Sequence, residues 1–249
     1  MEATRDGTTL YYETEGEGET VAFVGEAGYG AWQWGWQHRA LAGPYRSVVA
    51  DLRGTGRSDA PDGPYSVSTL AADLDAVLAD ANADLAHLVG LGLGGAVALE
   101  YAFRFGRARS LTLVGTAASG DRLTDAYADL GTDGMEAALS TGFLAEQPDV
   151  VDGIAEWRAG DADPSGFAAQ RVAFEGFDRS GELYECTLPS LVLHGEADRA
   201  VPPEAGRELA EGLPRGEFRG FEGAGHLVTV ERSRPVNDAL LAFLDARTG

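Results

Sequence analysis

Six residues at positions 90–95, Gly-Leu-Gly-Leu-Gly-Gly, carry the strongest indication of chemistry in this chain. They follow an apolar run at 85–89 and precede a helix-forming run at 96–103. As Gly-x-Gly-x-x-Gly they match a dinucleotide-binding turn, in which glycines let the backbone approach a pyrophosphate. As Gly-x-Ser-x-Gly they match the strand-to-helix turn that exposes a nucleophilic serine, with Gly92 at the serine position. The two interpretations predict different chemistry.

The place of this turn in the chain disfavours dinucleotide binding. A dinucleotide fold has the turn after its first strand and an acidic residue about 20 positions later, at the end of the next strand. Here at least two β-prone runs precede the turn, and the next run, at 111–114, ends in Gly-Thr-Ala. We therefore expect no cofactor. A nucleotide-dependent oxidoreductase stays as a hypothesis that a fluorescence titration with NAD(P) tests.

Three further motifs follow β-prone runs in a fixed order around this turn. Residues 51–58 read Asp-Leu-Arg-Gly-Thr-Gly-Arg-Ser, residues 194–202 read His-Gly-Glu-Ala-Asp-Arg-Ala-Val-Pro, and residues 223–226 read Gly-Ala-Gly-His. In order and spacing, the four motifs resemble the α/β-hydrolase superfamily, in particular its esterase and enol-lactonase-like members. The resemblance implies an eight-stranded, mostly parallel sheet with helices on both faces, an inserted helical lid, and a triad in the chain order nucleophile, acid, histidine.

The resemblance assigns the site residues one by one. Asp198 matches the acid and His226 the base, while the nucleophile position falls on Gly92. The oxyanion hole is expected to use the backbone N–H of Leu93, after the elbow, and that of Glu26, in a Val-Gly-Glu segment where the family has His-Gly-x. Because both the nucleophile and this segment depart from the family pattern, ordinary serine hydrolysis is in doubt.

Each of these residue types also has a structural interpretation. His226, in a Gly-Ala-Gly-His turn before an apolar helix start, suits a loop histidine over a pocket with its Nδ1 held by a carboxylate, or a capping histidine. Asp198 precedes Val-Pro-Pro, where it is either the triad acid or a helix cap. The Glu26 side chain is either an acid or base beside the histidine or an exposed acid. Tyr29 and Trp32 either line a substrate pocket or pack under the lid.

The missing hydroxyl at position 92 excludes an acyl-enzyme there and leaves three interpretations. In the first, Asp198 orients His226, which acts as general base on a water in the vacated space or on an acidic proton of the substrate. The substrate is then a small, mostly apolar ester, lactone or dicarbonyl compound. In the second, the chain is a non-catalytic member of the family that binds a small ligand. In the third, it is a serine hydrolase inactivated by a serine-to-glycine change at position 92.

Strand and helix patterns indicate how these residues are positioned. Runs typical of strands lie at 8–13, 20–24, 47–50, 85–89, 111–114, 191–193 and 217–221, and helices are predicted at 70–81 and 237–246. Strands that alternate with helices indicate parallel βαβ units covered on both faces. We assign residues 1–119 and 188–249 to the hydrolase core and residues 120–187 to a helical lid inserted between core strands. Helical runs within this lid are predicted at 135–143, 150–157 and 167–174.

Composition limits the partners and the location. The 249 residues suit one large domain, and the single cysteine excludes an internal disulfide. No apolar run approaches about 18 residues, so we expect no contact with a membrane. The polar residues 1–6 predict a cytoplasmic location. We expect a small-molecule substrate or ligand as partner, and the oligomeric state, a homo-oligomer included, stays open.

The charge balance is strongly acidic. Forty acidic residues against 19 basic ones, all arginine, give a net charge of −21. This charge disfavours nucleic acid, which needs basic patches that neutralise phosphates. It predicts a halophilic protein adapted to multimolar salt, where the Debye length falls to about 3 Å or less and self-repulsion is screened. The alternative is an acidic protein from a GC-rich genome.

Overall fold

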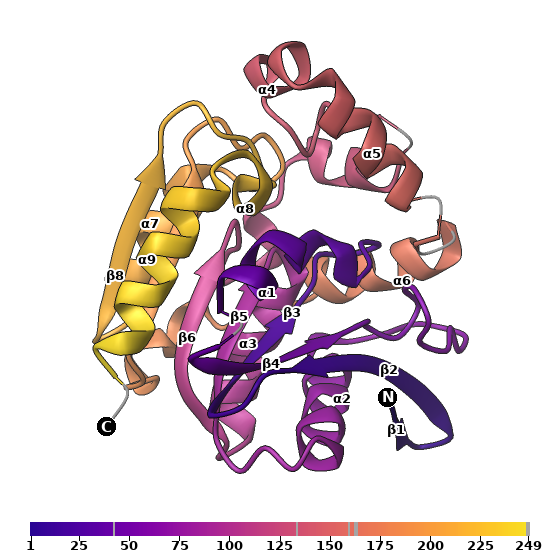
Figure 1. The fold of residues 1–249 in the computed structure, drawn as a ribbon, viewed down its shortest axis with the longest axis vertical. Coiled ribbons are helices and arrows are strands. Elements are labelled where there is room, and N and C mark those ends of the chain that lie inside the picture. The colour runs from indigo at the N-terminus through magenta and orange to yellow at the C-terminus, as the bar shows by residue number, and fades with distance from the viewer. Residues whose placement is uncertain (42, 133, 159, 162–163, 248–249) are drawn as a thin grey trace.

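The computed structural model describes residues 1–41, 43–132, 134–158, 160–161 and 164–247. Within this described part, eight strands form one sheet in the order β1-β2-β4-β3-β5-β6-β7-β8 (Figure 1). The strands are β1 (Glu2–Arg5), β2 (Thr8–Glu15), β3 (Glu19–Val24), β4 (Tyr45–Ala50), β5 (Ala86–Leu91), β6 (Ala108–Val114), β7 (Ser190–Gly195) and β8 (Gly216–Phe221). The β1–β2 and β2–β4 pairs are antiparallel and the others are parallel. The predicted α/β-hydrolase sheet is confirmed.

Helices cover both faces of this sheet and connect its parallel strands. The helices of the core are η1 (Ala31–Trp34), α1 (Gly35–Leu41), α2 (Val67–Asp80), α3 (Leu93–Arg104), α7 (Pro203–Gly212), α8 (Val228–Glu231) and α9 (Ser233–Asp245). α2 packs against α3, and α1 packs against α9. Because the parallel strands are buried on both faces, they read in the sequence as continuous apolar runs rather than alternating ones.

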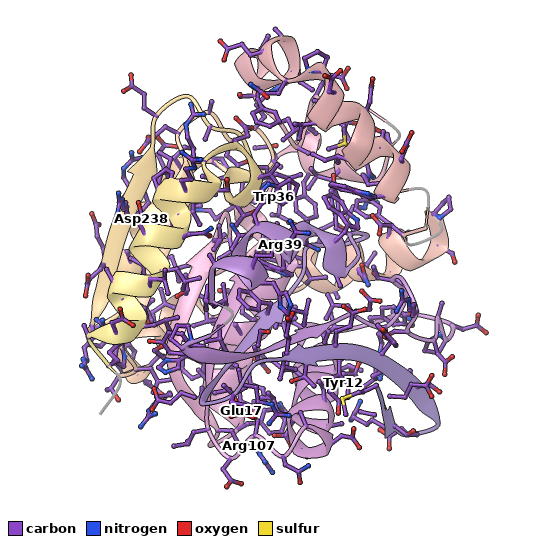
Figure 2. The ribbon with its side chains drawn as sticks, viewed as in Figure 1. Tyr12, Glu17, Trp36, Arg39, Arg107 and Asp238 are labelled. Carbon is purple, nitrogen blue, oxygen red and sulfur yellow. The ribbon has the colours of Figure 1, made fainter. Side chains whose placement is uncertain are left out.

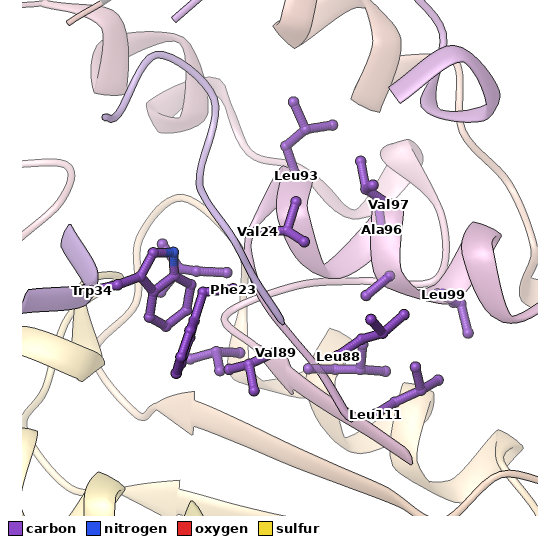
Figure 3. Close-up of a cluster of buried hydrophobic side chains, with 14 of the residues drawn as sticks. Phe23, Val24, Trp34, Leu88, Val89, Leu93, Ala96, Val97, Leu99 and Leu111 are labelled. Atoms are coloured by element: carbon purple, nitrogen blue, oxygen red, sulfur yellow. The ribbon is translucent and has the colours of Figure 1, made fainter. Parts of the chain in front are cut away.

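The core lies between the central strands and α3, and it fixes the position of the glycine turn. Every residue of β5 is buried. Figure 3 shows the side chains that pack around β3, β5 and the start of α3, among them Phe23, Val24, Leu88, Val89, Leu93, Ala96, Val97 and Leu111. The turn at 90–95 and the loop that follows β3 are therefore anchored by buried side chains on both sides.

The segment between β6 and β7 forms helices that stand at the carboxyl ends of the strands (Figure 1). Its elements are η2 (Gly120–Arg122), η3 (Asp125–Gly131), α4 (Thr141–Glu146), α5 (Pro148–Arg158), α6 (Pro164–Glu175) and η4 (Ser180–Glu185). In the part of this insert that the structure describes, no residue belongs to a strand of the sheet. None of the described helices is long and apolar enough to cross a bilayer.

Several elements differ from the sequence prediction, β1 and the helix predicted at 135–143 among them. β1 was not predicted, and it pairs with β2 at the edge of the sheet. The helix predicted at 135–143 is wrong, because α4 begins only at Thr141. Ser140 accepts a hydrogen bond from the backbone N–H of Phe143 and so caps the start of α4. The carbonyl of Ala138 accepts from the backbone N–H of Leu227 at 2.8 Å, so a tertiary contact replaces the helical bond there.

Candidate active site

Gly92 lies at the sharp turn between β5 and α3. Its φ of 52° and ψ of −114° are unfavourable for residues with a side chain. The turn is held in place from β6, because the N–H of Gly92 donates to the carbonyl of Val114 at 2.9 Å. The hydroxyl of Thr116 in turn donates to the carbonyl of Gly92 at 2.7 Å. Position 92 therefore has the backbone of a nucleophile elbow without the side chain of a nucleophile.

The carboxylate of Glu26 fills the space beside Gly92. Glu26 follows β3 and is fully buried. A Cβ atom built on Gly92 would lie 1.4 Å from Oε2 of Glu26, about the length of one covalent bond. A serine at position 92 is therefore incompatible with Glu26 in this position. Oε2 also lies as far from that Cβ as a serine oxygen would, so a side chain, rather than the expected water, takes the place of the missing hydroxyl.

The other oxygen of Glu26 lies among the amides expected to form an oxyanion hole. Oε1 accepts from the N–H of Leu93 at 3.1 Å, from the N–H of Ala27, and from the hydroxyl of Tyr127 at 2.6 Å. The N–H of Glu26, the second donor expected from the sequence, instead donates to Oε1 of Gln33 at 3.0 Å. The second backbone amide directed at Oε1 is therefore that of Ala27, not that of Glu26.

His226 connects Glu26 to Asp198. Its Nδ1 lies 2.8 Å from Oδ2 of Asp198, and its Nε2 lies 2.6 Å from Oε2 of Glu26. Both ring nitrogens thus face a carboxylate and both donate, which is the arrangement of an imidazolium. Burial alone would lower the pKa of His226, but the negative charge and hydrogen bond of Asp198, together with those of Glu26, outweigh it and raise this pKa to about 10.

Asp198 is oriented by its own turn after β7. Its Oδ1 accepts from the N–H of Ala200 at 2.9 Å and from that of Val201 at 3.0 Å. α7 begins later, at Pro203, so Asp198 does not cap that helix. Burial by itself would raise the pKa of Asp198, but the positive charge of His226 and the hydrogen bonds to this carboxylate hold it well below its ordinary value.

Tyr127, on η3, covers the site from the insert. Besides its hydrogen bond to Glu26, its ring stands edge-on to His226, with 6.4 Å between ring centroids. Burial and the neighbouring carboxylate raise the pKa of Tyr127 well above its usual value, so the phenol keeps its proton and remains a donor. Tyr127 was not predicted as a site residue, because a single tyrosine in a stretch rich in Ala and Asp carries no motif.

Tyr29, in the loop after β3, and Trp32, in η1, contact the insert through their side chains. Tyr29 is buried, and its hydroxyl donates to the carbonyl of Leu130 at 3.3 Å, so it packs under the insert. The indole of Trp32 donates to Asp161 at 2.9 Å and lies 5.9 Å from the ring of Trp157. A cleft of about 550 Å³ beside it is lined by Trp32, Gly35, Trp36, Arg39 and Trp157, and Figure 2 labels Trp36 and Arg39 on α1.

The insert is tied to the core around the site. Gln170 of α6 accepts from the N–H of Gly28 at 2.6 Å and donates to the carbonyl of Arg53 at 2.7 Å. Glu231 accepts from the N–H of Ser140 at 2.7 Å. The side chains of His226 and Glu26 have no exposed surface, so a reactant can reach them only after part of this covering moves.

The site offers little to a phosphate or a metal ion. The first amide of α3, which would face a pyrophosphate, already donates to Glu26. A bound anion there would also meet a buried carboxylate. Across the described ranges, no group of three His, Cys, Asp or Glu side chains is arranged to hold a metal ion. The arrangement instead places an imidazolium and two backbone donors around the carboxylate of Glu26.

Comparison with known proteins identifies the family of this chain. A model of the alpha/beta hydrolase family matches residues 23–239. A non-heme chloroperoxidase of Kitasatospora aureofaciens is 28% identical over 270 residues, which cover 97% of this chain and 98% of that protein. A 2-hydroxy-6-oxononadienedioate/2-hydroxy-6-oxononatrienedioate hydrolase of Paraburkholderia phymatum is 30% identical over 275 residues, which cover 96% of this chain and 92% of that protein. The crystal structure of the enol-lactonase from Burkholderia xenovorans superimposes with a TM-score of 0.87 at 27% identity, covering 98% of this chain and 100% of that one. The chain belongs to the alpha/beta hydrolase family.

Proposed function

We propose that this protein hydrolyses small, mostly apolar molecules, with Oε2 of Glu26 in the role of the serine oxygen and with Asp198 and His226 as its dyad. One observation carries the proposal: Oε2 lies 1.4 Å from the Cβ position of residue 92. The same oxygen lies 2.6 Å from Nε2 of His226. It therefore has both the position and the hydrogen bond of a nucleophile, although it belongs to another loop.

The charges of the site support a two-step reaction. Carboxylates act as nucleophiles in enzymes that form covalent intermediates. Attack by Glu26 on a substrate converts its carboxylate into a neutral ester or anhydride. One of the two charges that raise the pKa of His226 is then lost, so the imidazolium can release its proton. The neutral imidazole, oriented by Asp198, becomes the base that activates water in the second step.

The covering insert and the relatives support a small substrate. We assign residues 120–187 the role of a lid, since Tyr127 and Gln170 bond to the loop that carries Glu26. The named relatives include an enol-lactonase and a hydrolase of a small oxo-diacid. Esters, lactones and dicarbonyl compounds, the classes expected from the sequence, therefore form the first panel of substrates to test.

The second candidate is a family member that binds a small ligand without turnover. It is favoured by the completeness of the hydrogen bonding around Glu26. Oε1 accepts from Leu93, Ala27 and Tyr127, and Oε2 is bonded to His226, as in a finished structural network.

Turnover of the panel by single variants distinguishes the two candidates. Glu26→Gln and His226→Ala should each lower kcat by at least about 10³-fold, as for loss of a nucleophile or its base. Glu17→Gln, an exposed change in the turn before β3, is the matched control and should be silent. Full activity of Glu26→Gln contradicts the proposal. Absence of turnover in every variant, with a ligand that still raises Tm, supports the binding protein.

A further inference from the structure

A second cleft lies where the insert meets the core, apart from the buried Glu26 and His226. It has a volume of about 490 Å³, and neither of these two residues is among its described lining residues. Its walls come from η1 and the loop before it on the core side, and from the end of α5 and the residues after it on the insert side. It shares Trp32, Gly35 and Trp157 with the cleft of about 550 Å³ described above, so the two clefts adjoin.

Two carboxylates line this cleft, and consecutive backbone amides hold them. Asp51, directly after β4, accepts from the N–H of Ala31 at 2.9 Å, and Asp161, after α5, accepts from the N–H of Gly30 at 2.8 Å. Within the described part of the chain, neither carboxylate forms an ion pair with an arginine or a histidine. The cleft therefore has two negative charges without a direct counter-ion.

The arginine that lines the same cleft is already engaged. The guanidinium of Arg57 lies 3.3 Å from Glu13 and also donates to the hydroxyl of Tyr11. Burial raises the pKa of Asp161 to about 6, and the charge of Asp51 adds to this. The hydrogen bonds to this carboxylate and the charge of a nearby arginine oppose the shift without cancelling it. A cation that enters the cleft would stabilise both carboxylates in their charged form.

Indole rings form the apolar walls beside these charges. The rings of Trp32 and Trp36 each lie 5.9 Å from that of Trp157, measured between centroids. Trp157 is large and apolar, yet it is 49% exposed. Trp34 also lines the cleft, and its buried Nε1 has no hydrogen-bond partner among the described residues. Because the faces of indole rings attract cations as well as apolar groups, such walls suit an organic cation.

We infer that this cleft binds an arylalkylamine, with its primary ammonium group at Asp51 and Asp161. The ring of this ligand lies against Trp32 and Trp157, which line both clefts. A primary ammonium brings three N–H donors, and carboxylate oxygens have lone pairs beyond those that the backbone amides use. Arg39 lines the adjoining cleft, so the positive charge of the ligand belongs at the acidic end. The net charge of −21 also raises the local concentration of cations.

A series of ligands that differ in charge tests the inference on the unaltered protein. Isothermal titration calorimetry compares 2-phenylethylamine, 2-phenylethanol and phenylacetate at one KCl concentration and at a pH above 7, where Asp161 is ionised. The amine should bind at least about tenfold more tightly than the alcohol, because its ammonium bonds to charged groups, and phenylacetate should bind most weakly. Equal affinity for the amine and the alcohol overturns the inference.

Two variants assign the ends of the ligand. Asp161→Asn keeps an acceptor but removes the charge, so it should weaken binding of the amine at least about tenfold and leave that of the alcohol unchanged. Trp157→Leu, at an exposed position that folding tolerates, should weaken binding of both ligands. The matched control Asp152→Asn, an exposed change on α5, should change neither affinity. Unaltered amine binding in either Asp161→Asn or Trp157→Leu contradicts the inference.

Glu26→Gln distinguishes this cleft from the candidate active site. Since Glu26 is fully buried and does not line the cleft, this variant should bind 2-phenylethylamine as the unaltered protein does, whatever happens to its turnover. If Glu26→Gln abolishes amine binding while Asp161→Asn does not, the amine binds at the buried site and the inference is wrong. Loss of turnover in Glu26→Gln with amine binding intact supports both proposals, each at its own place.

Discussion

His226 lies between two buried carboxylates that are arranged alike and held differently. Asp198 and Glu26 each use one oxygen for backbone N–H groups and the other for the imidazole. The donors to Asp198, at Ala200 and Val201, belong to its own turn. Those to Glu26 come from its neighbour, from the elbow after β5 and from the insert.

This difference fits a positioning role for Asp198 and the reacting role that we propose for Glu26. Asp198 is placed by the backbone donors of its own turn, neither of which belongs to the insert. Glu26 is held by its neighbour Ala27 and by two segments that are distant in the chain, the elbow and the insert, and it borders Gly92, which has no side chain. The family motif is kept at Asp198, on one side of the histidine. On the other side it is changed at two positions, Glu26 and Gly92, and these two residues lie against each other.

Activity should separate the two carboxylates most strongly. We expect Glu26→Gln to lower kcat by up to about 10⁶-fold, as for loss of a nucleophile, and Asp198→Asn by about 10⁴-fold, as for loss of an orienting acid. Asp238→Asn, on the outer side of α9 (Figure 2), is the exposed control. Single-turnover kinetics measure both. A larger loss for Asp198→Asn would reverse the assignment.

A side chain at position 92 should displace Glu26 and leave Asp198 in place. Gly92→Ala combines a positive φ with a collision against Oε2, and we expect about 2–4 kcal/mol less free energy of unfolding. Adding Glu26→Ala removes the collision and should recover part of this loss. Gly153→Ala, in α5 with open space where its Cβ would lie, should be neutral or stabilising by up to about 1 kcal/mol. Urea unfolding measures all of them, and additivity of the first two changes would contradict the contact.

The pKa of His226 should depend on both carboxylates, Asp198 and Glu26. Its pKa, near 10 when folded against 6.5 for the ordinary group, makes a stability contribution that is complete below about pH 6.5 and is lost as the pH rises towards 10. Asp198→Asn and Glu26→Gln should each lower this pKa. NMR titration of the ring measures it, and a histidine that is neutral at pH 7 would contradict the paired arrangement.

Tyr127→Phe should have a smaller effect on activity, and this effect should act through Glu26. It removes one of three donors to Oε1, and one hydrogen bond to a charged group corresponds to about tenfold in kcat. The pKa of His226 should rise slightly, since the carboxylate carries more of its charge. A matched change of an exposed phenol, Tyr184→Phe, should do nothing.

Salt should change the stability through the surface charges and leave the pKa of His226 nearly unchanged. With a net charge of −21, Tm is expected to rise towards multimolar KCl as exposed carboxylates are screened. The pKa of His226 should change little over the same range, because its ion pairs are buried. A Tm that is flat or falling in KCl would contradict the halophilic interpretation.

Strands and helices with a strong pattern were predictable, and those set by tertiary contacts were not. β3 and β5 form at the predicted apolar runs, because strands buried on both faces must be apolar throughout. The helix predicted at 135–143 fails, since Ala138 bonds to the loop that precedes α8 instead of continuing a helix. Tyr127 and Ala27 were not identified, because neither lies in a motif and their roles depend on which segments meet at Glu26.

The sequence by itself determined the resemblance to the family, with Gly92, Asp198 and His226 in the family's order along the chain. These residues sit in turns whose glycines and flanking strands are local features, so a linear pattern suffices to find them. Only the tertiary structure decided what replaces the missing hydroxyl. The close approach of Oε2 of Glu26 to the Cβ position of residue 92 joins residues 66 positions apart, and it depends on β3 and β5 lying side by side in the sheet. Non-local packing of this kind leaves no periodic trace in the sequence.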